Sequence, residues 1–166
     1  MTRGFVPIRH KTGGTIRPVS YPMASNVTIF KGDLVMANAT GDVQAATAGA
    51  NTSIIGVAAE YKVNPVGGNN QILIFDDPDI IYSVRSSGVV AATDRFLNAP
   101  LSVGAGGNPV TGLSSHMLNA GAMATTATLP LKILGKVDAP NNNWGEVLDL
   151  EVCLNSTALT PAVAGV

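Results

Sequence analysis

Short apolar runs, each closed by glycine, aspartate or proline, follow one another along this chain and constrain its fold more than any other feature. The stretch from Phe30 to Gly49 is typical, because Gly41-Asp42 separates one apolar run from the next. Glycine there supplies the positive φ that tight hairpin turns need. Comparable runs occupy residues 27–30, 34–37, 43–47, 54–63, 71–75, 80–85, 131–137 and 146–155. They predict an all-β domain, either a small β-barrel or a β-sandwich.

Alternation within the longer runs predicts which faces are buried. From Ile54 to Val63, the odd-numbered positions form one apolar face, so we expect a strand with one buried side. From Glu146 to Asn155, leucine and valine at even positions alternate with a second face that includes Cys153. We interpret Cys153 as a small structural side chain of this strand, without a chemical role. The run from 71 to 75 is apolar on both faces, as expected for a strand inside a barrel or beneath a second layer.

The first 25 residues differ from the rest in charge and stiffness. Four of the ten basic residues lie here and Lys31 is a fifth, whereas no acidic residue precedes Asp33. The remainder holds five basic and eleven acidic residues, a balance of −6. Three prolines and Gly13-Gly14 favour extended chain with a flexible joint. We therefore expect an extended basic N-terminal arm over residues 1–25 and a β-rich domain over residues 26–166.

A basic arm of this kind can bind a protein partner, bind nucleic acid or remain solvated. Dispersed charges without an aromatic stacking platform argue against nucleic acid. An acidic surface on a neighbouring subunit suits the arm better, because an extended segment can order on binding. The residues expected to bind this partner are Arg3, Phe5, Arg9, Lys11 and Arg17. On this hypothesis, removing residues 1–24 leaves the β domain folded but weakens attachment.

The stretch from about 97 to 129 shows no strand period and is rich in glycine, alanine, serine and threonine. We expect a long irregular loop insertion that packs on a sister subunit. Within it, Leu113 to Ala120 is a possible helical segment closed by Gly121.

Composition favours an assembled protein. Charged residues are only 13% of the chain, about half of the usual 25%, so we expect a partner to cover part of the surface. The other explanation is a neutral β protein of the secreted type. One cysteine excludes a disulfide framework. We see no export leader and no apolar run long enough to span a membrane, and expect a chain made in the host cytoplasm.

Residues that carry chemistry are sparse, and we predict no enzyme, no cofactor and no metal site. His10 and His116 have no sequence context that pairs them with a nucleophile, so structural roles are favoured. The three aspartates between 76 and 79 are oxygen ligands in principle, but an acidic turn explains them better. The glycines from 104 to 107 do not open a helix, which excludes a phosphate loop. Trp144 is interpreted as an edge-packing residue rather than an interface anchor.

Several segments resemble a known family. The stretch "VTIFKGDLVMANATGDVQAATAGANTSIIGVAAEY", with Gly32-Asp33-x-Val35, Gly41-x-Val43 and Ile55-Gly56-Val57-Ala58, resembles the front of the head decoration, or capsid cement, proteins of tailed bacteriophages. The later "ILIFDDPDIIYSV" and "LPLKILGKVDAP" look similar to their following sheet segments. The resemblance covers about Asn26 to Leu154 and implies a β-tulip-like barrel or sandwich.

The same resemblance implies a function. It suggests a virion structural protein that decorates the outer capsid surface and clamps neighbouring capsomers against internal DNA pressure. Its partners would be the major capsid protein and itself, as a homotrimer, with no nucleic acid and no membrane. An alternative is a tail or fibre module that binds a host receptor or glycan, which calls for exposed aromatic residues such as Trp144, Tyr21, Tyr61 or Tyr82. A hydrolase or lyase on a β-barrel is the least favoured, and mutation of His116 would test it.

Overall fold

The computed structural model describes residues 3–49, 53–159 and 161–166 and has an all-β architecture, as expected. A five-stranded antiparallel sheet has the order β1-β9-β14-β13-β10, and a second has the order β2-β8-β6-β4-β5. Two-stranded sheets, β3-β7 and β11-β12, complete the fold. Among the described residues no sheet closes into a barrel, so the sandwich is the compatible form of the two expected.

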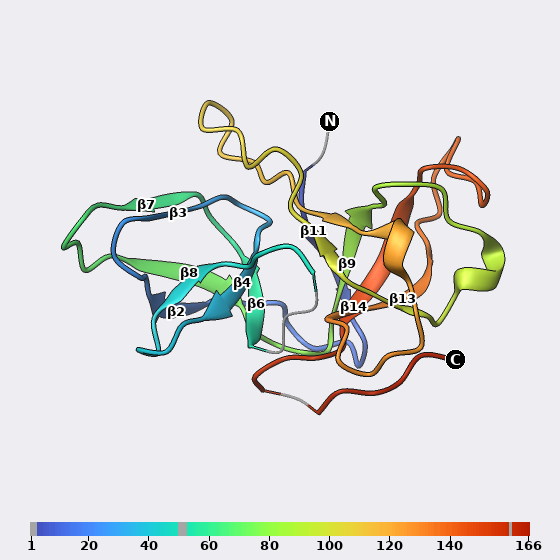
Figure 1. Ribbon diagram of the computed structural model, residues 1–166, viewed down its shortest axis with the longest axis horizontal. Coiled ribbons are helices and arrows are strands. Elements are labelled where there is room, and N and C mark those ends of the chain that lie inside the picture. Colours follow the sequence, from blue (N-terminus) through green and yellow to red (C-terminus); the bar gives the residue numbers. More distant parts are fainter. Residues whose placement is uncertain (1–2, 50–52, 160) are drawn as a thin grey trace.

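The strands are short and follow the apolar runs of the sequence. Their bounds are β1 (Val6–His10), β2 (Val19–Pro22), β3 (Val27–Ile29), β4 (Leu34–Ala37), β5 (Val43–Ala45), β6 (Ile54–Ala58), β7 (Lys62–Asn64), β8 (Gln71–Phe75), β9 (Ile80–Arg85), β10 (Asn98–Ala99), β11 (Leu101–Ser102), β12 (Met117–Leu118), β13 (Leu131–Lys136) and β14 (Asp149–Leu154). Two short 3-10 helices are η1 (Ala92–Asp94) and η2 (Ala120–Ala122). Figure 1 shows two lobes, one with β2, β3, β4, β7 and β8 and the other with β9, β13 and β14.

Strand β6 joins the two lobes. Ile54 and Val57 pack in the main core with β9, β13 and β14, whereas Ile55 and Ala58 pack in a second core within the other lobe. All five residues of β6 are therefore buried, and the expected strand with one buried side from Ile54 to Val63 is wrong. That run breaks after residue 58, because the chain leaves the sheet and returns as β7 beside β3.

Tyr82 lies in the main core where the two lobes meet. Its hydroxyl donates a hydrogen bond to the Phe75 carbonyl across the junction, with 3.2 Å between the oxygens. The Phe5 ring meets the Tyr82 ring edge-on, at 6.4 Å between centroids. Burial raises the pKa of Tyr82 far above its ordinary value, so this hydroxyl remains a donor at all working pH values.

The N-terminal segment is extended, as expected, but it forms part of both large sheets. Strand β1 pairs with β9 in one sheet, and β2 pairs with β8 in the other. Phe5 is only 2% exposed and belongs to the main core. These contacts argue against the expectation that residues 1–24 can be removed without unfolding the β domain, since their removal would take away two strands and a core side chain.

Residues 97–129 are more ordered than a loop insertion. They contribute β10 to the five-stranded sheet and form the β11-β12 pair, in which Leu101 and Leu118 are fully buried. The helical segment expected from Leu113 to Ala120 is wrong, because Met117 and Leu118 pair with β11 instead. Gly121 lies inside η2, where its N–H donates to the Asn119 side chain.

The inward face of β14 follows the predicted alternation, with Leu150, Val152 and Leu154 in the main core. Cys153 faces the other way but is also buried, because Lys11, Lys132 and the C-terminal segment surround it. Burial raises the pKa of its thiol above the ordinary value, which agrees with the predicted role as an inert filler.

Candidate partner-binding surface

Two glycines place the start of the chain against the turn between β3 and β4. Gly4 has φ +65° and Gly32 has φ +89°, and a Cβ on Gly4 would lie 2.4 Å from the Gly32 carbonyl oxygen. The Phe5 N–H donates to that same carbonyl at 2.9 Å. Only residues without a side chain allow this crossing, because a Cβ at either position would meet backbone. The crossing fixes the direction in which Arg3 leaves the core.

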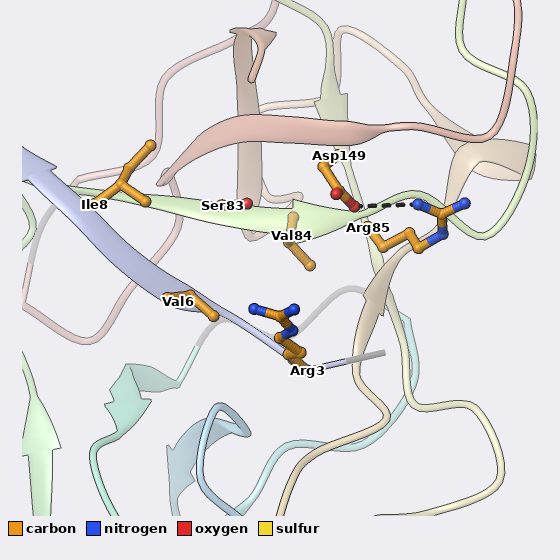
Figure 2. A pocket seen from close by; sticks show the side chains of 8 residues that line it. Arg3, Val6, Ile8, Ser83, Val84, Arg85 and Asp149 are labelled. Atoms are coloured by element: carbon orange, nitrogen blue, oxygen red, sulfur yellow. Dashed lines mark hydrogen bonds and ion pairs between the residues drawn. The ribbon is translucent and has the colours of Figure 1, made fainter. Parts of the chain in front are cut away.

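Arg3 borders a hollow of about 350 Å³ on the sheet formed by β1, β9 and β14. The other residues that line it are Gly4, Val6, Ile8, Ser83, Val84, Arg85 and Asp149. Figure 2 shows the Arg3 guanidinium reaching from the start of β1 toward Val84, with Arg85 and Asp149 on the neighbouring strands. Val6 and Ile8 are 39% and 41% exposed on an edge strand, so the hollow combines apolar and basic groups.

The charges around this hollow are only partly paired. Arg85 lies 3.4 Å from the Asp149 carboxylate and 3.4 Å from the Val147 carbonyl, both long contacts for hydrogen bonds. Within the described residues, Arg3 has no ion pair and no hydrogen bond from its guanidinium. An exposed guanidinium beside apolar side chains suits a partner segment that carries both a carboxylate and an apolar group.

The five residues predicted to bind a partner occupy different environments. Arg9 forms an ion pair with Glu151 at 2.8 Å, and Lys11 lies 3.8 Å from Asp79. Phe5 is buried in the core, so its side chain is not available to a partner. Arg17 is exposed and, like Arg3, has no ion pair within the described ranges. Two of the four basic residues of the segment, Arg9 and Lys11, therefore meet acidic side chains of their own chain.

His10 is held by hydrogen bonds that define its tautomer. Its Nδ1 accepts from the backbone N–H groups of Thr12 and Gly14, at 3.2 and 3.1 Å. The proton must then lie on Nε2, which donates to the Asp77 carboxylate at 2.9 Å. The Asp79 N–H also donates to Asp77, and these contacts lower the pKa of that carboxyl.

The same three residues, His10, Asp77 and Asp79, are close enough to hold a metal ion. Metal coordination by Nε2 needs a lone pair, but the proton occupies that nitrogen while Nδ1 accepts from the backbone. Lys11 beside Asp79 adds a positive charge to the same place. The arrangement therefore favours a turn held by histidine over a metal centre, in agreement with the acidic turn expected from the sequence.

A second histidine and aspartate meet inside the molecule. His116 and Asp33 are 5% and 2% exposed, and their Nε2 and Oδ1 atoms are 3.5 Å apart. His116 Nδ1 accepts from the Leu34 N–H at 3.0 Å, while Asp33 Oδ2 accepts from the Phe30 N–H at 2.9 Å. Burial lowers the pKa of His116, and Asp33 opposes this effect. The imidazole of His116 is neutral, and its Nδ1 lone pair accepts the hydrogen bond from Leu34. This nitrogen is therefore not free to act as a general base.

Sequence reasoning did not find the pairing of Asp33 with His116 or that of Arg85 with Asp149. Asp33 lies in a Gly-Asp turn and His116 in a segment without a strand period, 83 positions further along the chain. No local pattern connects them. Arg85 and Asp149 could have been paired, because both lie in predicted strands, Arg85 at the end of one and Asp149 on the outward face of the other.

Two aromatic residues pack against other side chains, whereas Phe96 is 47% exposed. The Arg95 guanidinium lies 5.5 Å from the centre of the Trp144 ring, which also packs against the main core. This placement agrees with the edge-packing role expected for Trp144. Tyr61 stacks on Phe30 at 5.2 Å between centroids.

Comparison with protein-family models and with curated proteins finds no match to this sequence. In the part of the chain that the structure describes, no helix has the length and apolar character needed to cross a membrane.

Proposed function

We propose that this protein is a virion structural protein that decorates the outer surface of a bacteriophage head and cements neighbouring capsomers. Its partners are the major capsid protein and two further copies of itself in a homotrimer. The sequence resemblance motivates this proposal, and the all-β fold is compatible with it. The observation that carries it is the hollow beside β1, where the unpaired Arg3 and the half-exposed Val6 and Ile8 lie together.

A cementing role has a simple physical basis. A protein that binds the assembled lattice but not the separated subunits stabilises the lattice by mass action. In a trimer, three copies of the surface act together, because the second and third contacts become intramolecular once the first has formed. A mixed apolar and basic surface supports such a contact. The apolar groups supply surface area that is buried on binding, and the charge of Arg3 orients the partner.

The first experiment combines the purified protein with undecorated phage heads and measures co-sedimentation, together with the mass of the free protein. We expect saturation at a fixed number of copies per head and the mass of a trimer. A monomer that does not bind heads would contradict the proposal and direct attention to the tail or fibre module, which a glycan array would test.

Point variants locate the contact better than deletion does, because residues 1–24 contain two strands. Arg3→Glu reverses an exposed charge at the hollow and should weaken head binding by at least tenfold, equivalent to about 1.4 kcal/mol. Lys136→Glu reverses a charge on β13, outside the residues that line the hollow, and serves as the matched control. Equal binding by the two variants would place the contact elsewhere on the molecule.

A further inference from the structure

An apolar pocket lies between the start of β4, the end of β5 and the segment that follows β11. Its volume is about 350 Å³, and apolar groups dominate its lining, including Phe30, Ala45, Ala46, Ala48 and Val103. Asp33 and His116 line the same pocket. It is therefore distinct from the hollow beside β1, with which it shares no lining residue.

Gly107 brings the loop after β11 close to one wall of this pocket. A Cβ on Gly107 would lie 2.1 Å from the Phe30 ring, so only glycine permits this contact. Further along, Leu113 bridges to Lys31, which attaches the segment to the lobe that contains β3 and β7. Figure 1 shows this segment, in yellow, leaving β11 and extending above that lobe. The pocket is thus formed by parts of the chain that are distant in sequence.

The polar pair at the pocket has unused hydrogen-bonding capacity. His116 Nε2 carries the proton, because Nδ1 accepts from Leu34. Among the described residues Asp33 Oδ1 has no close donor, since its contact with His116 Nε2 is 3.5 Å long and Oδ2 accepts from the Phe30 N–H. A good N–H···O hydrogen bond measures about 2.9 Å. One donor and one acceptor therefore lie side by side in a mainly apolar pocket, whose other polar side chains are those of Thr28 and Thr47.

These two atoms define the polar group that they can bind. A hydroxyl oxygen accepts one hydrogen bond and donates another, and a point about 2.8 Å from both atoms exists when they are 3.5 Å apart. A carboxylate would be repelled by Asp33, and an ammonium would lose its hydration against the apolar lining. A primary amide would leave further N–H and C=O capacity without partners.

We propose that this pocket binds an apolar group that carries a single hydroxyl, in particular a phenol. The hydroxyl accepts from His116 Nε2 and donates to Asp33 Oδ1, while the ring lies against Phe30 and the alanines of the lining. The phenol comes either from a small molecule or from a tyrosine side chain of another protein. This inference does not depend on the capsid role, because it rests on a different part of the surface.

Nuclear magnetic resonance tests the proposal on the full chain with three probes: p-cresol, toluene and N-acetyl-tyrosinamide. We expect p-cresol to produce saturable shifts of the His116 and Phe30 ring signals. His10, the other histidine, lies outside the pocket and serves as an internal reference. Toluene lacks the hydroxyl and should bind about tenfold more weakly, the loss expected for one hydrogen bond. Equal binding of toluene and p-cresol, or no shift at His116, would overturn the proposal.

Two variants separate the polar and apolar parts of the site. Asp33→Asn should reduce p-cresol affinity toward that of toluene. Ala48→Leu adds a side chain at the exposed rim, leaves the polar pair intact and should abolish binding of both. Unchanged p-cresol binding by Ala48→Leu would also overturn the proposal. Binding of N-acetyl-tyrosinamide as tight as that of p-cresol supports a tyrosine of a partner, whereas binding of p-cresol alone supports a small phenol.

Discussion

Gly56 in the centre of β6 should not tolerate even one added methyl group. A Cβ at this position would lie 2.0 Å from the Phe75 carbonyl oxygen and 2.9 Å from the Ile74 side chain. A normal carbon–oxygen contact is about 3.3 Å, so Gly56→Ala forces β6 and β8 apart. These strands pair at only two positions, Val57 with Phe75 and Ala58 with Ile74. The added methyl therefore disrupts the place where β6 meets β8.

The size of the effect follows from two contributions. Overpacking of a tight core costs about 1–3 kcal/mol, and a weakened ladder hydrogen bond adds about 1 kcal/mol. We therefore expect Gly56→Ala to lower the free energy of unfolding by about 2–4 kcal/mol. For an m-value of about 2 kcal/mol/M in urea, the unfolding midpoint falls by about 1–2 M.

Gly135→Ala in β13 is the matched control. An added Cβ there meets no atom within 4 Å, and the position also lies inside a strand. Its urea midpoint should stay the same or rise slightly, because alanine restricts the unfolded chain by about 0.4–1 kcal/mol. Urea titrations of both variants, followed by circular dichroism, provide the comparison. If Gly56→Ala unfolds at the same urea concentration as Gly135→Ala, the close approach of β6 and β8 is refuted.

Three further predictions concern the N-terminal segment and the histidines. The pKa of Asp77 is lowered in the folded state, so its contribution to stability is present above the unfolded pKa of about 4 and disappears as the pH falls through the folded value. Asp77→Asn should therefore lower the urea midpoint at pH 7, and this loss should become smaller as the pH falls below about 4; a loss that does not change with pH would contradict the assignment. Nitrogen-15 spectra at pH 8 should show His10 and His116 both protonated on Nε2, and a proton on Nδ1 of either would refute the hydrogen bonds described. Phe5→Ala should cost about 3–5 kcal/mol in calorimetry, whereas Arg3→Ala should change stability by less than about 0.5 kcal/mol; a small effect of Phe5→Ala would remove this residue from the core.

The strands were predictable from sequence because their signals are local. Apolar runs and Gly-Asp turns can be recognised from neighbouring residues alone. Strands β4, β5, β8, β9 and β13 lie where these runs predict. Burial was harder to predict for β6, since Ile54 and Ile55 face different cores and both read as apolar. The strands β10, β11 and β12 were not predicted, because each has only two residues and is too short to show alternation.

The candidate sites depend on contacts between distant parts of the chain. The basic charge of the N-terminal segment was visible in the sequence, but the sequence does not say that Glu151, Asp77 and Asp79 of the same chain meet it. The pocket with Asp33 and His116 likewise requires β4 and the segment before β12 to pack together. Only the three-dimensional fold supplies that information.

The position of β6 determines how the molecule responds to mechanical load. Because its side chains belong to both cores, neither lobe can separate from the other without breaking contacts in each. A pulling force applied to one sheet is transmitted through β6 to the other, so the two sheets share the load. We expect stretching of a single molecule to give one rupture event rather than two, a mechanical behaviour that the proposed cementing role would require.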